Sequence, residues 1–326
     1  MNVIVQKYGG TSLENKEKLD FICGNIIKYK KIYKNVVVVV SAQGKTTDNL
    51  LKKAYTYSKN PDKKALDMLL STGEMESASL LCMMLIEKGF DSVCLTGYQA
   101  GIVSNSDFGN AKIKNIYENN ILKHLKENKI VIITGFQASD RFGNITTLGR
   151  GGSDLSAVAI ASAIKAKKCE IYTDVDGVFS GDPKIIKKAK LIKSISYNEM
   201  LEAASSGAKV MHNRSIMVAK KSNIPIFVKN SQKEKNNLGT KIENKQDIEK
   251  YSVKMVSKSS NVSKITIIGQ MLMTNTDVIS KLFEIAKEEN IVIYMISFSE
   301  VAINIIVDET VADSFINKIH DTFIKE

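Results

Sequence analysis

The strongest constraint on the fold is a series of short runs of β-branched and aliphatic residues, each leading into a glycine- or serine-containing turn and then a helix-like segment. Two of these runs, VVVVV at 36–40 and IVIIT at 130–134, do not alternate between apolar and polar residues. Both faces of these strands are therefore expected to be buried, which is typical of a parallel sheet covered by helices on both sides. Similar runs occur within residues 3–10, 91–101, 169–178 and 224–231. We predict an α/β fold with a mostly parallel sheet sandwiched by helices.

Composition divides the chain into three segments. Residues 1–232 carry the pattern of strand, turn and helix, whereas residues 233–250 are polar, charged and rich in Asn, which predicts an exposed linker. Residues 251–326 follow the order strand, helix, strand, strand, helix, as in a small α+β (ferredoxin-like) domain that is one strand short. The stretch YSVKMVS at 251–257 is the candidate for the missing strand.

The basic composition does not by itself indicate a nucleic-acid partner. The 46 Lys and Arg residues exceed the 35 Asp and Glu residues, but the lysines fall in short helical clusters, and no zinc-finger, helix-turn-helix or RNA-binding signature is present. The four cysteines have no CxxC spacing, so we expect reduced thiols and no metal held by protein side chains alone. Without a signal-like start or a run of about 18 apolar residues, we predict a cytoplasmic protein with no membrane partner.

Several turns carry charged side chains where the parallel strands end, which is the edge at which such sheets bind ligands. Lys7 leaves the first strand toward Gly9 and Gly10, where backbone N–H groups can approach phosphate oxygens. GKTT at 44–47 lacks the upstream glycine of a Walker loop, and the GxGxxG pattern is absent. The turns therefore predict a small-molecule site that is neither an ordinary P-loop nor a dinucleotide fold.

The stretch TTLGRGGSD at 146–154 is the most informative of these turns. Only three residues of the chain are arginines, so lysine is its ordinary cation, and Arg150 is expected where a planar, two-pronged donor is needed. Ser153 or Asp154 is available as the N-cap of the following helix. The stretch STGE at 71–74 is interpreted as a turn that opens an apolar helix, with Glu74 near its N-terminus.

Taken together, these turns resemble those of the aspartokinases of the amino acid kinase family. The shared motifs appear in family order as KYGGTS, VVVVVSAQGKTTDNL, LLSTGE, LTGYQAG, GRGGSDLSA, TDVDGV, GDPK and GAKVMH. The resemblance covers residues 3–232 and implies transfer of the γ-phosphoryl group of ATP, with Mg²⁺ bound to the nucleotide, to the side-chain carboxylate of L-aspartate. The product, 4-phospho-L-aspartate, is the first intermediate toward lysine, threonine and methionine.

The resemblance also implies roles for individual residues. The catalytic residues would be Lys7, Asp154 and Lys209, with Asp154 orienting Lys7 rather than accepting a proton. The amino acid would be held by Ser41, Thr47, Glu74, Arg150, Gly152 and Ser153. The nucleotide would be held by Lys7, Gly9, Gly10, Gly44, Thr173, Asp174, Asp182, Lys184 and Lys209. Glu74 suits the α-ammonium group of aspartate, and Arg150 suits its α-carboxylate.

The C-terminal segment, residues 251–326, resembles a single ACT-type regulatory module, whereas aspartokinases usually carry two. It is similar to the second module, so the first is expected to be missing as a whole, and 251–257 would complete the sheet. Thr276 and Asp277 stand where relatives often have Pro-Gly in the effector-binding turn, which leaves open whether lysine or threonine inhibits. We expect this module to join two subunits in a homodimer.

Two alternatives remain open from the sequence. The chain could phosphorylate another amino acid or carboxylate, such as glutamate or N-acetylglutamate, as other branches of the family do. It could also be a non-catalytic subunit that binds aspartate or an effector through its ACT-like end. The presence of Lys7, Glu74, Arg150 and Asp154 argues against a subunit without activity.

Overall fold

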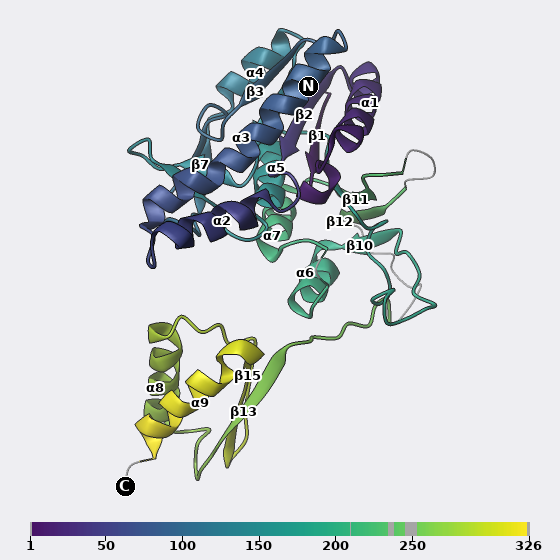
Figure 1. The fold of residues 1–326 in the computed structure, drawn as a ribbon. Coiled ribbons are helices and arrows are strands. Elements are labelled where there is room, and N and C mark those ends of the chain that lie inside the picture. The colour runs from purple at the N-terminus through teal and green to yellow at the C-terminus, as the bar shows by residue number, and fades with distance from the viewer. Residues whose placement is uncertain (1, 209, 234–237, 245–252, 325–326) are drawn as a thin grey trace. The chain divides into compact units, whose positions relative to one another are not determined.

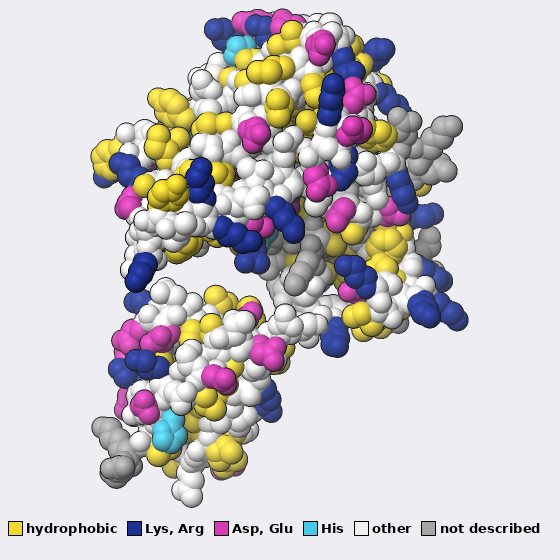
Figure 2. All heavy atoms as spheres, in the orientation of Figure 1, with side chains coloured by type: hydrophobic (Ala, Val, Ile, Leu, Met, Phe, Trp, Pro, Cys, Tyr) yellow, Lys and Arg dark blue, Asp and Glu magenta, His cyan; other side chains and the backbone are white. Residues whose placement is uncertain are grey.

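The structure is a computed structural model that describes residues 2–208, 210–233, 238–244 and 253–324. Within these residues the chain forms two compact units, Met1–Ser257 and Lys258–Glu326, which are drawn in Figure 1 and described separately below. On the face shown in Figure 2, basic side chains are spread over each unit and interspersed with acidic ones.

The larger unit is built on a sheet that has eight strands in the described residues, in the order β10-β12-β11-β9-β1-β2-β6-β3. Every neighbouring pair is parallel except β11 with β12. The strands are β1 (Val3–Tyr8), β2 (Asn35–Val40), β3 (Ser92–Leu95), β6 (Ile130–Thr134), β9 (Lys168–Thr173), β10 (Ser194–Ser196), β11 (Ile226–Asn230) and β12 (Thr240–Glu243). The prediction of an α/β fold with a mostly parallel sheet is confirmed.

Helices cover both faces of this sheet, which explains the unbroken apolar runs (Figure 1). In β2, Val36, Val38 and Val40 belong to a core cluster with α1 and α3, whereas Val37 and Val39 belong to the cluster on the other face, with α4, α5, α6 and α7. The helices are α1 (Lys16–Tyr33), α2 (Thr46–Tyr57), α3 (Lys63–Glu87), α4 (Asn119–Lys126), α5 (Gly152–Ala163), α6 (Tyr197–Ser205) and α7 (Asn213–Ser222).

A second, smaller sheet positions the glycine-rich loop. Its strand order is β5-β4-β7-β8, and its strands are β4 (Ile102–Ser104), β5 (Ile113–Ile116), β7 (Gln137–Ser139) and β8 (Ile145–Thr147). Strand β8 ends directly before Leu148, and α5 begins at Gly152, so the loop that contains Arg150 joins the small sheet to a buried helix.

The smaller unit has the predicted order of elements. It consists of β13 (Val262–Ile268), α8 (Thr276–Glu288), β14 (Met295–Phe298), β15 (Ala302–Asp308) and α9 (Glu309–Phe323). Its described strands form an antiparallel sheet in the order β13-β15-β14. One face of this sheet packs on both helices through a core that includes Ile265, Leu282, Ile305 and Phe315.

The segment predicted to be an exposed linker, residues 233–250, differs from its prediction. Residues 240–243 of the expected linker form β12, which inserts between β10 and β11 of the large sheet. Of the stretch expected to complete the small sheet, residues 251–252 lie outside the described residues, and 253–257 form no strand. Instead, Val256 N–H donates to Ser180 C=O at 2.9 Å, so the backbone of this stretch finds its partner in the larger unit.

The beginning of α3 also differs from its prediction. The helix starts at Lys63 with Asp62 as its N-cap, so STGE lies in mid-helix rather than in an opening turn. Gly73 is needed for close packing, because a Cβ there would lie 2.8 Å from the Cβ of Ala42. By length and composition alone α3 would pass as a membrane span, but half of its apolar window is buried inside the unit.

Candidate active site

A cavity of about 280 Å³ lies where β1 and β2 end and α5 begins. Its lining consists of Lys7, Gly10, Ser41, Ala42, Gly44, Thr47, Glu74, Phe136 and residues 149–154. The structure therefore brings together every residue predicted to hold the amino acid, and it adds Lys7 and Asp154 to them. Ala42 and Phe136 were missed because an alanine and a phenylalanine carry no chemical signal in a sequence.

Lys7 and Asp154 form an ion pair across the cavity. Lys7 is near the end of β1, Asp154 is in the first turn of α5, and Lys7 Nζ lies 2.7 Å from Asp154 Oδ1. The two side chains are only 12% and 14% exposed, so solvent screens the pair weakly. Gly9 adjoins the ammonium group, because a Cβ on Gly9 would lie 3.5 Å from Lys7 Nζ. The carboxylate of Asp154 thus holds the ammonium group of Lys7 in place at the cavity, as an orienting group would.

The turns after β1 and β2 interlock and leave no room for side chains between them. Gly44 N–H donates to Gly10 C=O at 2.9 Å, and Ser41 N–H donates to Tyr8 C=O at 3.1 Å. A Cβ on Gly10 would lie 2.5 Å from the carbonyl oxygen of Ala42. Backbone from both turns therefore forms one floor of the cavity, which is the arrangement that lets N–H groups approach an anion.

Glu74 is a buried carboxylate with half of its hydrogen-bonding capacity unused. Its Oε1 accepts a hydrogen bond from Ala42 N–H at 3.0 Å, whereas Oε2 has no partner among the residues that the structure describes. The residue is 3% exposed, and this burial raises the pKa of Glu74 to about 7, although the bond from Ala42 N–H opposes the rise. A cationic ligand group in the cavity would satisfy both the free oxygen and the unbalanced charge.

The loop of residues 149–154 depends on glycine for its shape. Gly149 and Gly151 have left-handed φ angles of +74° and +72°. Gly151 is the N-cap of α5, so the prediction of Ser153 or Asp154 in that role was wrong; neither side chain caps the helix. The first turn of α5 instead lines the cavity, where the positive end of the helix dipole favours a bound anion. Arg150 is exposed and makes no hydrogen bond or ion pair with the described residues, so its guanidinium is available to a ligand.

Two polar side chains, the buried Asp67 and the half-buried Arg214, hold the loop in place, and the sequence did not reveal these contacts. Asp67 on α3 accepts hydrogen bonds from Gly109 N–H at 3.0 Å and from the backbone and hydroxyl of Thr147, both at 2.7 Å. Arg214 on α7 donates to the carbonyl oxygens of Leu148 and Ala111. The guanidinium group of Arg214 thus binds backbone carbonyl oxygens. The scarcity of arginine in this chain therefore does not by itself identify a ligand-binding residue.

Four predicted nucleotide residues that the structure describes do not line the cavity: Thr173, Asp174, Asp182 and Lys184. Thr173 ends β9, and its hydroxyl donates to Asp174 Oδ1 at 3.0 Å. Asp182 Oδ1 accepts from Lys184 N–H at 2.9 Å, which is the ordinary chemistry of a tight turn. Lys209 lies outside the described residues. The nucleotide roles of these residues stay predictions.

Two family models match the chain. One, described as the amino acid kinase family, matches residues 2–230, and the other, described as an ACT domain, matches residues 265–323. An aspartokinase of Bacillus sp. (strain MGA3) is 48% identical over 270 residues, which cover 82% of this chain and 65% of that protein. The chain therefore belongs to the amino acid kinase family and, within it, to the aspartokinases.

Two further relatives cover nearly the whole chain. An aspartokinase of Geobacillus stearothermophilus is 37% identical over an alignment that covers 99% of this chain and 97% of that protein. This alignment has 398 positions, 72 more than the 326 residues of this chain. The crystal structure of Escherichia coli aspartokinase III with aspartate and ADP has a TM-score of 0.81 at 25% identity and covers 98% of this chain and 83% of that one.

Proposed function

We propose that this chain transfers the γ-phosphoryl group of ATP to the side-chain carboxylate of L-aspartate, giving 4-phospho-L-aspartate and ADP. The aspartokinase relatives support the reaction, and one observation in the cavity supports the substrate. Glu74, a buried carboxylate with a free oxygen, lies in the same cavity as the unpaired Arg150 and the Lys7–Asp154 pair. An α-amino acid with a second carboxylate is complementary to this set of charges.

The chemistry needs cations and positioning rather than a base. A side-chain carboxylate has an ordinary pKa near 4, so the nucleophile is already ionised at neutral pH. The barrier comes from bringing this anion in line with a charged phosphoryl group, and fixed positive groups lower it. Lys7, oriented by Asp154 at 2.7 Å, and the first turn of α5 would supply such groups.

Each end of the amino acid would have its own partner. The α-ammonium group of aspartate would bind the free oxygen of Glu74, and its positive charge would return Glu74 to the ionised state. The α-carboxylate would bind Arg150 through two parallel N–H donors, with Ser153, Ser41, Thr47 and Gly152 as neighbouring contacts. The side-chain carboxylate would then point toward Lys7.

Mg²⁺ would enter this site with the nucleotide. No group of three or more His, Cys, Asp or Glu residues suited to a metal ion occurs in the described part of the chain. Mg²⁺ takes most of its ligands from substrate phosphates and water in many kinases, and the donors of this site fit that mode of binding. The bound ion would neutralise charge on the phosphates, while Lys7 neutralises charge on the transferred group.

The decisive experiment measures ADP release from ATP with L-aspartate, L-glutamate and N-acetylglutamate as alternative acceptors, with lysine and threonine added in turn. Activity with aspartate at least about tenfold above the other acceptors supports the proposal. Preference for glutamate or N-acetylglutamate would favour the alternative kinase. No activity with any of the three would favour a regulatory subunit that lacks catalysis.

We further propose that the smaller unit joins two copies of the chain as a homodimer and that the module absent from this chain is the first of two. The extra alignment positions of the Geobacillus relative support the second statement. Strand β13 is at an edge of the described sheet and carries Ile268, which is 80% exposed. Light scattering should give a dimer mass for the chain and a monomer mass for Ile268→Asp. Ile316→Asp is the matched control, because Ile316 is an exposed side chain of α9, and a dimer in both variants would contradict an interface at β13.

A further inference from the structure

The larger unit contains a second pocket, of about 200 Å³, beside α1 and the strands β9 and β11. None of its lining residues lines the first cavity, and none of them is acidic. Its lining includes four lysines, Lys28, Lys168, Lys229 and Lys233, together with Tyr29 and Tyr33. A pocket with several cations and no acid on its walls attracts anions.

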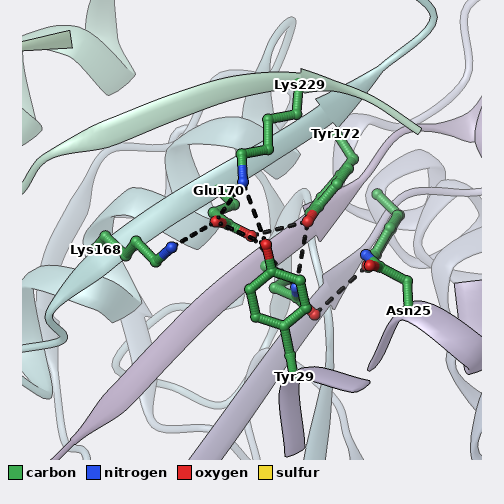
Figure 3. Close-up of polar contacts among 8 residues, drawn as sticks. Asn25, Tyr29, Lys168, Glu170, Tyr172 and Lys229 are labelled. Carbon is green, nitrogen blue, oxygen red and sulfur yellow. Dashed lines mark hydrogen bonds and ion pairs between the residues drawn. The ribbon is translucent and has the colours of Figure 1, made fainter. Parts of the chain in front are cut away.

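A single buried carboxylate lies beneath the wall of this pocket. Glu170 is fully buried, and its Oε1 contacts two ammonium groups, Lys168 Nζ at 2.7 Å and Lys229 Nζ at 2.9 Å. Its Oε2 accepts a hydrogen bond from the hydroxyl of Tyr172 at 2.8 Å. Figure 3 shows the two lysines approaching Glu170 from different strands. Burial alone would raise the pKa of Glu170, but the attraction of Lys229 and Lys168 holds it below its ordinary value.

This arrangement leaves an excess of positive charge at the pocket. Two partly buried ammonium groups, 16% and 12% exposed, share one carboxylate, so one of their two charges is not balanced. Lys28 adds another cation at the rim, whereas Lys233 is paired with Asp176 at 2.6 Å. The side chains at this pocket therefore carry a net charge of about +2, which a doubly charged anion would balance.

The two central lysines are held in place rather than free on the surface. Lys168 Nζ lies 5.2 Å from the ring centroid of Tyr33, 5.6 Å from that of Tyr29 and 5.1 Å from that of Phe227. Lys229 Nζ also donates a hydrogen bond to the hydroxyl of Tyr29 at 3.2 Å. Each ammonium group has three N–H donors. The shared carboxylate oxygen uses one donor from each lysine, and the Tyr29 hydroxyl uses a second donor of Lys229. Donors thus remain for a ligand in a preorganised position.

We propose that this pocket is a binding site for the phosphate group of a small molecule, with Lys168 and Lys229 as its principal ligands. A phosphate monoester carries up to two negative charges and three acceptor oxygens, which match the unbalanced charge and the unused donors. The pocket selects against cationic amino acids such as lysine for the same electrostatic reason. Tyr172 lines the pocket and stacks on Tyr8, the neighbour of Lys7, with ring centroids 4.7 Å apart, so the pocket is structurally joined to the first cavity.

The test measures binding of inorganic phosphate to the full chain by isothermal titration calorimetry at constant ionic strength, with chloride as the other anion. Lys168→Met and Lys229→Met keep the length of each side chain and remove its charge, and each is expected to weaken phosphate binding at least tenfold. Glu170→Gln removes the competing negative charge and is expected to strengthen binding several-fold. Lys129→Met, which breaks a surface pair with Glu127, is the matched control and should leave binding unchanged.

Phosphate can also bind in the first cavity, so one further variant separates the two sites. Lys7→Ala should still bind phosphate in the second pocket, whereas Lys229→Met should not. This expectation does not depend on whether the chain is a kinase. Binding that is lost in Lys7→Ala and kept in Lys168→Met and Lys229→Met would overturn the proposal. Phosphate affinity that falls equally in Lys129→Met would also overturn it, because general surface charge would then explain binding. If Glu170→Gln does not fold, the two lysine variants still decide the outcome.

Discussion

A buried glutamate lies at each of the two pockets, Glu74 in the lining of the first and Glu170 beneath the wall of the second, and the two glutamates have opposite surroundings. Glu74 is 3% exposed, accepts a hydrogen bond from Ala42 N–H and forms no ion pair with the described residues, and burial raises its pKa to about 7. Glu170 is fully buried but contacts two lysines, which hold its pKa below the ordinary value. Similar burial therefore accompanies pKa shifts in opposite directions, because the partners differ.

This difference indicates what each pocket lacks. A buried carboxylate without a counterion is unfavourable in the empty protein, so the first cavity gains by binding a cationic group. A carboxylate that is shared by two lysines leaves positive charge in excess, so the second pocket gains by binding an anion. The same residue type thus favours an ammonium ligand in one place and a phosphate in the other.

The largest effect is expected when the cation of the first cavity is removed. Lys7→Ala should lower kcat by about 10³-fold, equal to about 4 kcal/mol, because a positioned positive group would no longer face the transferring phosphoryl group. Steady-state ADP release measures this effect, and circular dichroism checks the fold. A variant that keeps most of its kcat would remove Lys7 from the phosphoryl role. Lys129→Met, a surface lysine, serves as the control.

The next largest effect concerns the stability of the second pocket. Glu170→Gln should lower the free energy of unfolding by about 3 kcal/mol, because it leaves two partly buried lysines without their counterion. Because the folded pKa of Glu170 is lowered, its stabilising contribution is present above the unfolded pKa and is lost as the pH falls through the folded pKa. Urea unfolding at pH 7 and at pH 3 tests both statements. A variant as stable as the parent chain at pH 7 would show that the lysines do not depend on Glu170.

The substitution Glu74→Gln should raise the free energy of unfolding, whereas Glu170→Gln should lower it. The folded pKa of about 7 exceeds the ordinary value of 4.5, so the folded protein holds a proton that the unfolded chain releases between these pH values. The free energy of unfolding therefore falls as the pH rises from 4.5 through 7. A glutamine at this position cannot ionise, so Glu74→Gln removes this fall in the free energy of unfolding. We expect the substitution to stabilise the ligand-free protein by about 2 kcal/mol at pH 8 and by much less at pH 5.

Function should suffer from the same Glu74→Gln substitution. The KM for aspartate should rise about 30-fold, because the ammonium group of the substrate loses its charged partner. In the parent chain, kcat/KM for aspartate should decrease as the pH falls below about 7, where Glu74 takes up a proton. A pH profile for aspartate that is the same in the variant and the parent would contradict the assignment of Glu74 to the ammonium group.

The smallest effect is expected at the exposed side of the first cavity. Arg150→Lys keeps the charge but removes the planar fork, and the KM for aspartate should rise about tenfold while the KM for ATP stays constant. Initial rates at varied aspartate and varied ATP distinguish the two constants. A higher KM for ATP alone would assign Arg150 to the nucleotide instead.

Local sequence was sufficient to predict the elements that are specified by residues close to them in the chain. The runs in β2 and β6 predicted strands buried on both faces, and the motif around Arg150 predicted a loop that opens a helix at the ligand edge. Two predictions from local sequence were wrong for different reasons. STGE lies in mid-helix because α3 already begins at Lys63, after a local N-cap at Asp62 that the prediction did not use. Residues 253–257 form no strand, and the backbone of Val256 instead bonds to the distant Ser180.

The sequence by itself determined the parallel sheet and the position of the glycine turns, because periodicity and turn chemistry depend on neighbouring residues. The resemblance to the aspartokinases added the polar and charged residues of the first cavity, but not Ala42 and Phe136. Only the tertiary structure decided the directions in which the pKa values of Glu74 and Glu170 shift. Lys229 reaches Glu170 from β11, 59 residues along the chain, while the carboxylate of Glu74 accepts a hydrogen bond from the backbone N–H of Ala42. A pKa depends on burial and on the charges nearby in space, and neither can be read from neighbouring residues in the sequence.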